Sequence, residues 1–147
     1  MQTIYKYIAT LGFIGFIPYA PGTFGSAAGL LLALFTVPAD VTLLMILPPL
    51  FFLGMIAAHN AEKQLGKDSG RIVIDELCGY VVSVLFVPKT TGYLLTAFVL
   101  FRFFDIVKPP PIRKIESIIP GGTGIMLDDV LAGMYANVCL QVWMRFV

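Results

Sequence analysis

Five apolar segments, separated by prolines, glycines and short polar loops, determine what this chain can fold into. Inside lipid, each backbone N–H and C=O group needs a hydrogen-bond partner within the structure, and a helix supplies those partners within one segment. In the first segment Gly25, Gly29 and Ala33 recur every four residues, forming a stripe on which another helix can pack closely. We therefore expect an all-α bundle with helices over 23–37, 41–58, 72–87, 91–107 and 124–147.

The composition indicates that this bundle lies in a membrane. Of the 147 residues, 58% are hydrophobic and 13% are charged, whereas soluble domains are about 45–50% apolar and about 25% charged. The first apolar run, 4–17, is short and closes at Pro18, which is typical of an interfacial helix. We expect a single domain over 1–147, an integral membrane bundle of about five helices plus a short N-terminal interfacial helix. The net charge of +1 gives no reason to expect a nucleic-acid partner.

The charged residues separate by side when the chain is traced through five membrane crossings. The loops 59–71 and 108–123 fall on the same side, and the one acidic residue on the other side is Asp40. Of the ten basic residues, only Lys89 and Arg145 share the side of Asp40. Lysine and arginine accumulate on the cytoplasmic side of membrane proteins, so we expect the polar end of the bundle to face the cytoplasm.

Two pairs of adjacent carboxylates interrupt the apolar segments, Asp75–Glu76 and Asp128–Asp129. A negative charge at a helix N-terminus is favourable, but apolar residues flank both pairs, and ionisable residues inside a membrane segment generally mark function. Asp129 shares a helix face with small residues, so a neighbouring helix can approach that carboxylate closely. Because Mg²⁺ prefers oxygen ligands and leaves positions for water and phosphate, we expect these four carboxylates to bind Mg²⁺.

A third polar group lies near the end of segment 91–107, where Arg102, Asp105 and Lys108 recur at intervals of three. Residues at this spacing lie near one face of a helix. One interpretation is structural: Arg102 pairs with Asp105, and Lys108 extends to the membrane surface. The other is functional: Arg102 and Lys108 bind phosphate oxygens, and Asp105 is a metal ligand or a general base. The residues alone leave both interpretations open.

Two glycine-rich stretches precede helices. Residues 21–26 include Thr23 and Ser26, and residues 121–124 read Gly-Gly-Thr-Gly. Backbone N–H groups and hydroxyls at the start of a helix can bind an anion, so Thr23 and Ser26 are candidate substrate-binding residues. Neither stretch matches a P-loop. His59, near the end of its segment, is more typical of a structural histidine than of a metal ligand.

Four of these stretches, in this order and at this spacing, resemble the phosphatidylglycerophosphatase A family. The resemblance covers most of the chain from about Pro18, and its motifs span 21–26, 75–79, 102–112 and 121–133. His59 and Asp68 also match positions that the family carries. The resemblance implies a Mg²⁺-dependent phosphatase of the bacterial inner membrane, which converts phosphatidylglycerophosphate to phosphatidylglycerol and phosphate.

The chemistry of a phosphomonoester agrees with that resemblance. Its anionic oxygens must be neutralised, a nucleophile aligned and the leaving oxygen stabilised. Carboxylate-bound Mg²⁺ together with Arg102 and Lys108 would meet the first and third needs, and Asp105 and Asp128 complete the candidate catalytic set. A water activated by the metal is the expected nucleophile, and an aspartyl-phosphate intermediate is the alternative. The expected partners are the lipid substrate and membrane lipids.

Two other classes of protein stay open as alternatives on the sequence alone. Carboxylates inside membrane segments also occur in small ion-binding transport or channel subunits. Clustering of the acidic residues at one end of the bundle, with none at mid-depth, argues against a conduction path. A purely structural membrane protein would leave both acidic pairs without a role.

Overall fold

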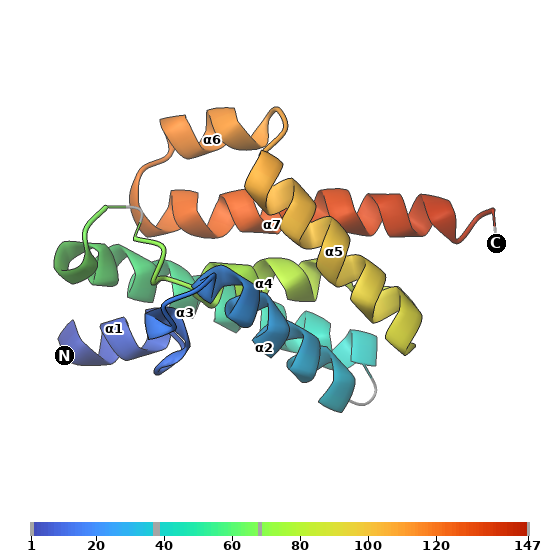
Figure 1. Cartoon of the computed structure of the whole chain (residues 1–147), viewed down its shortest axis with the longest axis horizontal. Coiled ribbons are helices and arrows are strands. Elements are labelled where there is room, and N and C mark those ends of the chain that lie inside the picture. Colours follow the sequence, from blue (N-terminus) through green and yellow to red (C-terminus); the bar gives the residue numbers. More distant parts are fainter. Residues whose placement is uncertain (1, 37–38, 68, 147) are drawn as a thin grey trace.

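The computed structural model describes residues 2–36, 39–67 and 69–146 (the main chain alone at 39 and 116). Over these residues the chain forms seven α-helices and a short 3-10 helix with no strand, which confirms the all-α expectation (Figure 1). The elements are α1 (Gln2–Ala9), η1 (Ile14–Phe16), α2 (Pro21–Phe35), α3 (Ala39–Leu65), α4 (Ile74–Ser83), α5 (Thr91–Val107), α6 (Ile112–Ile118) and α7 (Gly121–Trp143).

The short helix α4 is the centre of the bundle, where it packs against α2, α3, α5 and α7. Seven of its ten residues are buried. At 1.5 Å per residue it is about 15 Å long, half the ~30 Å thickness of the hydrocarbon core of a bilayer. The expectation of a long helix over 72–87 was therefore wrong, because this apolar run forms a short helix that other helices surround.

Two of the described helices are long and apolar enough to cross a membrane, α7 and the Asp40–Leu65 part of α3. This number differs from the five expected from the sequence. Large apolar side chains also face outward, and Phe52 on α3, Val99 on α5 and Val138 on α7 are each more than half exposed. Soluble monomers rarely expose extensive apolar surface, so this surface indicates association with a membrane.

Small residues let the neighbouring helices approach α4 closely. On α2, Gly25, Gly29 and Ala33 are buried, and a Cβ added at Gly29 would lie 3.0 Å from a carbonyl oxygen of α4. This confirms the packing stripe expected from their spacing. α7 crosses α4 at Gly133 and Gly79, where a Cβ added at Gly133 would lie 2.2 Å from the Gly79 carbonyl oxygen. The backbones of α4 and α7 can therefore meet only without side chains at this crossing.

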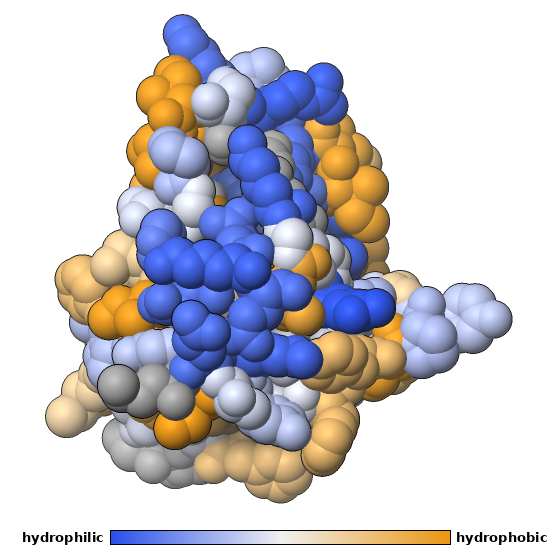
Figure 2. All heavy atoms as spheres, turned by 90° about the vertical axis from the view of Figure 1, so that its left-hand side faces the viewer, coloured by the Kyte–Doolittle hydropathy of each residue, from blue (hydrophilic) through white to orange (hydrophobic). Residues whose placement is uncertain are grey.

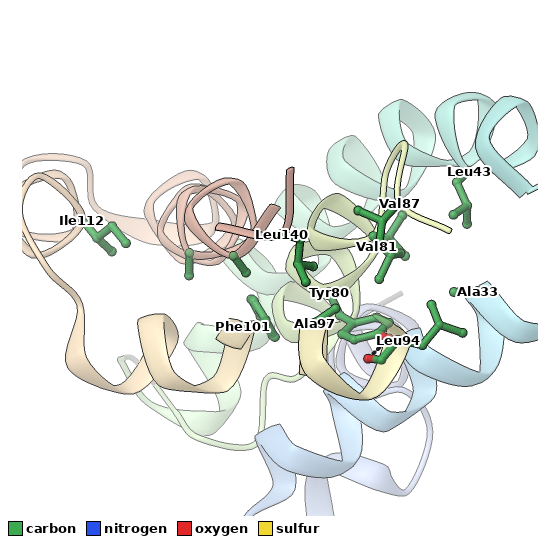
Figure 3. Close-up of a cluster of buried hydrophobic side chains, with 13 residues drawn as sticks. Ala33, Leu43, Tyr80, Val81, Val87, Leu94, Ala97, Phe101, Ile112 and Leu140 are labelled. Atoms are coloured by element: carbon green, nitrogen blue, oxygen red, sulfur yellow. Dashed lines mark hydrogen bonds between the residues drawn. The ribbon is translucent and has the colours of Figure 1, made fainter. Parts of the chain in front are cut away.

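A hydrophobic core joins α2, α4, α5 and α7 (Figure 3). Tyr80 and Phe101 are its largest fully buried side chains, and their rings meet edge to face with centroids 6.4 Å apart. The Tyr80 hydroxyl donates a hydrogen bond to the Leu94 carbonyl oxygen at 2.9 Å, as a buried tyrosine requires. A second cluster, around Ala57 and Met126, joins α3 and α7 beneath α1.

Three stretches that the sequence analysis treats as loops are helical. α3 continues through 59–65, where most residues are good helix formers. Residues 112–118 form α6, which packs on α7 and buries Ile112. α7 begins at Gly121, so the glycine-rich stretch is its first turn. Gly122 in that turn lies against α3, since a Cβ added there would be 2.1 Å from a carbonyl oxygen of α3.

Polar residues gather at one end of the molecule, as the charge pattern predicts. Figure 2 looks at this end and shows hydrophilic side chains along the middle of the face, with hydrophobic ones at its borders. The loop between α3 and α4 and the start of α7 lie at this end in Figure 1. Asp40 lies at the other end, where its carboxylate accepts hydrogen bonds from Lys89 Nζ at 2.7 Å and from the Phe86 backbone N–H at 2.9 Å.

Candidate active site

A cavity of about 470 Å³ opens at the polar end. The loop between α3 and α4 and parts of α4, α5, α6 and α7 form its wall. Ligand pockets usually measure about 300–1,000 Å³, so this cavity can hold a polar head group. Its charged lining residues are five carboxylates and three cations: Asp75, Glu76, Asp105, Asp128, Asp129, Lys67, Lys108 and Arg113. Six of these eight belong to the candidate set inferred from the sequence.

Three carboxylates converge at the innermost part of the cavity. Asp75 and Glu76 lie in the first turn of α4, and Asp129 lies on α7, one turn before the crossing with α4. One oxygen of each carboxylate lies within 4.8 Å of an oxygen of the other two. Asp75 Oδ1, Glu76 Oε2 and Asp129 Oδ2 are buried and have no hydrogen-bond partner among the described residues. Oxygen donors that converge without protein partners fit a divalent cation such as Mg²⁺.

Burial makes this cluster unfavourable as a set of bare charges. Loss of hydration raises the pKa of Asp75 well above its usual value, and the nearby carboxylates of Glu76 and Asp129 raise that pKa further. Loss of hydration also raises the pKa of Glu76. A cation between the carboxylates would offset their repulsion. The cluster is thus electrostatically incomplete as protein alone.

The fourth expected metal ligand, Asp128, contacts a different group. Its Oδ2 lies 2.6 Å from Lys108 Nζ, and its Oδ1 accepts a hydrogen bond from the Asp129 backbone N–H at 3.0 Å. Successive residues of a helix point about 100° apart, which separates the two adjacent carboxylates. The structure therefore brings together three of the four expected metal ligands and places the fourth beside a cation. Lys108 lines the cavity instead of extending to the membrane surface.

Arg102 and Asp105 form an ion pair on α5 through Nη1 and Oδ2, as the structural interpretation of their spacing predicts. Both side chains are largely buried, and Arg102 Nε has no hydrogen-bond partner within the described chain. Arg102 also approaches the carboxylate cluster, because a Cβ added at Gly22 would lie 3.1 Å from Arg102 Nη1 and 2.3 Å from Glu76 Oε1. An arginine and a lysine thus flank the cluster, and each contacts a carboxylate.

The remaining candidates lie apart from the cavity or cannot be placed. Ser26 is buried in α2, and its hydroxyl donates a hydrogen bond to the Gly22 carbonyl oxygen at 2.9 Å. Thr23 is partly buried in the first turn of the same helix. Within the described chain, neither residue lines the cavity. His59 is exposed beside the start of α7, and Asp68 lies outside the described residues.

Four polar cavity residues are absent from the candidates inferred from the sequence: Lys67, Ser69, Arg113 and Ser117. Lys67 and Ser69 lie in the loop between α3 and α4, whereas Arg113 and Ser117 lie on α6. The charge of these two stretches was the available signal, and it indicates a side of the molecule but not a site. Nothing in an apolar-segment pattern says how a surface connection folds over a cavity.

Comparison with known proteins adds evidence of a different kind. The family model for phosphatidylglycerophosphatase A matches residues 7–144. A protein of Bacteroides thetaiotaomicron named "Putative phosphatidylinositol-3-phosphatase" is 41% identical over 137 residues, which cover 87% of this chain and 86% of that protein. The phosphatidylglycerophosphatase A of Haemophilus influenzae is 39% identical over 146 residues, covering 94% of this chain and 90% of the relative.

A further relative, the phosphatidylglycerophosphatase A of Escherichia coli, is 34% identical over 134 residues, covering 87% of this chain and 77% of that protein. No solved structure matches the chain. The family match nevertheless extends over nearly all of the helices described above, including every residue of the carboxylate cluster. The chain belongs to the phosphatidylglycerophosphatase A family.

Proposed function

We propose that this protein is a Mg²⁺-dependent lipid phosphatase that hydrolyses phosphatidylglycerophosphate to phosphatidylglycerol and phosphate. The observation that carries the proposal is the buried cluster of Asp75, Glu76 and Asp129, in which one oxygen of each carboxylate lacks a partner among the described residues. Membership of the phosphatidylglycerophosphatase A family supports the same class of reaction. A purely structural protein gains nothing from burying three carboxylates that repel one another.

Asp75, Glu76 and Asp129 would hold the Mg²⁺ ion. When bound, the ion supplies positive charge that neutralises phosphate oxygens and stabilises the leaving oxygen. The contribution of the protein is to hold the three carboxylates on two helices that cross at glycines. Because those helices are fixed in a packed core, little reorganisation is needed when the substrate enters.

Arg102 and Lys108 are the proposed ligands of the substrate phosphate. A carboxylate already orients each cation, since Arg102 pairs with Asp105, and Lys108 Nζ lies 2.6 Å from Asp128 Oδ2. A phosphomonoester accepts charge-assisted hydrogen bonds, and the planar guanidinium can donate two of them in parallel. Asp105 and Asp128 are the proposed proton acceptors for the attacking nucleophile, because both line the same cavity as the carboxylate cluster.

The names of the relatives give two head groups to compare. Two relatives are named for phosphatidylglycerophosphate and one for phosphatidylinositol 3-phosphate. Both lipids carry a phosphomonoester on a polyol that a phosphodiester joins to diacylglycerol. We propose phosphatidylglycerophosphate as the substrate because the family model and two of these three relatives carry that name.

We infer a location in the bacterial inner membrane, with the cavity at the cytoplasmic surface. The long apolar helices α3 and α7 support insertion into the membrane. The accumulation of lysine and arginine at the cavity end supports the sidedness. A cavity at the membrane surface suits a lipid substrate, because its head group enters the cavity while its acyl chains stay in the bilayer.

The test is hydrolysis by the purified protein in detergent. We expect kcat/KM for phosphatidylglycerophosphate to exceed that for phosphatidylinositol 3-phosphate by at least about tenfold, equivalent to ~1.4 kcal/mol. Phosphate release should stop in excess chelator and return with added Mg²⁺. A preference for the inositol lipid would replace the substrate, and full turnover in excess chelator would remove the metal. Cation flux in liposomes without phosphatase activity would favour an ion-binding transport subunit.

A further inference from the structure

The cavity has a gradient of charge with depth. Its innermost wall is acidic, with Asp129 only 3% exposed and Asp128 only 6% exposed. Its mouth is basic, because Lys67 and Arg113 line the same cavity but are exposed to solvent. A single phosphomonoester bound over the carboxylate cluster makes no use of these two outer cations. Their position requires a second anionic group on the same ligand.

We propose that Lys67 and Arg113 form a second anion subsite, which binds the phosphodiester that joins the substrate head group to diacylglycerol. This proposal rests on the proposed function and extends it, because it says how the lipid is recognised beyond its reacting phosphate. The substrate then spans the cavity, with the phosphomonoester at the acidic inner wall and the phosphodiester at the basic mouth. The acyl chains continue from the phosphodiester toward the membrane.

Arg113 is held in a position that suits this role. Its Nη2 donates a hydrogen bond to the Val107 carbonyl oxygen at 3.2 Å, near the end of α5. A guanidinium has five N–H donors, and this bond uses one of them. The planar group matches the two non-bridging oxygens of a phosphodiester, to which it can donate two parallel hydrogen bonds.

Lys67 reaches the same cavity from the loop between α3 and α4, a different part of the chain from α6. The subsite therefore forms only when the loop and α6 are both folded over the cavity. Ser69 and Ser117 add a hydroxyl from each of these two segments to the wall. Outer cations are also needed on electrostatic grounds, since five carboxylates line the cavity and would otherwise repel an anionic phosphodiester.

The chain offers a matched control for testing this subsite. Lys114 is adjacent to Arg113 on α6 and is also exposed, but it is not among the residues that line the cavity. Arg113→Ala and Lys114→Ala each remove one positive charge from the same short helix. A difference between these two variants therefore reports a local contact and not the overall charge of the surface.

The experiment uses the full chain in detergent and two inhibitors that separate the two phosphates. Short-chain phosphatidylglycerol carries the phosphodiester alone, and inorganic phosphate mimics the phosphomonoester. For Arg113→Ala and Lys67→Ala we expect the inhibition constant of phosphatidylglycerol and the KM for phosphatidylglycerophosphate to rise about tenfold, since each variant loses a charge-assisted contact. The inhibition constant of inorganic phosphate should stay within about twofold, because a uniform binding contact lies outside the reacting centre. Arg113→Lys should recover part of the loss.

Three results would overturn the subsite: unchanged phosphatidylglycerol inhibition in both variants, an equal loss in Lys114→Ala, or an equal weakening of inorganic phosphate. Direct titration of short-chain phosphatidylglycerol by calorimetry gives the same comparison without turnover, and circular dichroism checks that each variant is folded. If the wild type fails to hydrolyse phosphatidylglycerophosphate but binds phosphatidylglycerol in an Arg113-dependent way, the proposed function fails while the subsite stands.

Discussion

The crossing of α4 and α7 gives a prediction that depends on geometry alone. A Cβ added at Gly133 would lie 2.2 Å from the Gly79 carbonyl oxygen, at least about 1 Å closer than ordinary contact at 3.4–4 Å. Both groups belong to helix backbones, so no flexible side chain can absorb the clash. Gly133→Ala must therefore push α7 away from α4 by about 1 Å, and overpacking of this kind costs about 1–3 kcal/mol of stability.

The same displacement should open the carboxylate cluster. Asp129 lies one helical turn from Gly133 on α7, whereas Asp75 and Glu76 lie on α4. Mg²⁺ requires its ligands at about 2.0–2.1 Å in near-ideal geometry, and a misplacement of about 1 Å in a catalytic site can cost about 100-fold in rate. We expect Gly133→Ala to lower kcat/KM for phosphate release about 100-fold and to raise the Mg²⁺ concentration needed for half-maximal activity.

Two further variants guard this test against a trivial loss of folding. A Cβ added at Gly92 meets nothing within 4 Å, so Gly92→Ala should behave like the wild type. A Cβ added at Gly22 would lie 2.3 Å from Glu76 Oε1, a flexible side-chain atom. Gly22→Ala should therefore displace a metal ligand at little cost in stability, which thermal unfolding in detergent measures. Wild-type activity and Mg²⁺ requirement in both Gly133→Ala and Gly22→Ala would refute the reasoning.

Three shorter predictions concern other parts of the chain. Arg102→Lys keeps the charge but loses the planar fork, so activity should fall with little change in Mg²⁺ affinity; full activity would mean that Arg102 only pairs with Asp105. Asp40→Asn weakens a partly exposed ion pair at the far end, so thermal unfolding should show a loss of no more than about 1 kcal/mol while activity stays unchanged, and a large activity loss would contradict the assignment of the cavity. In a Cys139→Ser background, Gly70→Cys should resist an impermeant thiol reagent in intact cells, and labelling from outside would reverse the proposed orientation.

Much of the fold follows from local pattern, and its failures have a physical cause. The prolines after Lys108 end α5 where the sequence predicts, at Val107. The glycines of α2 predict close packing because a missing Cβ has the same consequence in any bundle. The apolar run 72–87 was misjudged because hydrophobicity does not distinguish a membrane helix from a helix buried by other helices. Which of the two forms depends on the neighbours that cover α4.

The candidate site shows the same division between local and tertiary information. Asp75, Glu76 and Asp129 stand out because charges inside apolar segments are rare. The different environment of Asp128 follows from helix geometry, since adjacent residues point about 100° apart. Arg113 gives no such signal, because its place at the mouth of the cavity depends on how α6 packs on α7.

The most direct test of the central claim is Mg²⁺ binding measured by calorimetry in the absence of substrate. The cluster of Asp75, Glu76 and Asp129 predicts a saturable site in the wild type that is lost, or weakened at least about tenfold, in Asp129→Asn and Glu76→Gln. Both variants should stay folded, because removing one of several crowded negative charges relieves repulsion in the metal-free protein. Wild-type Mg²⁺ affinity in both variants would contradict the account.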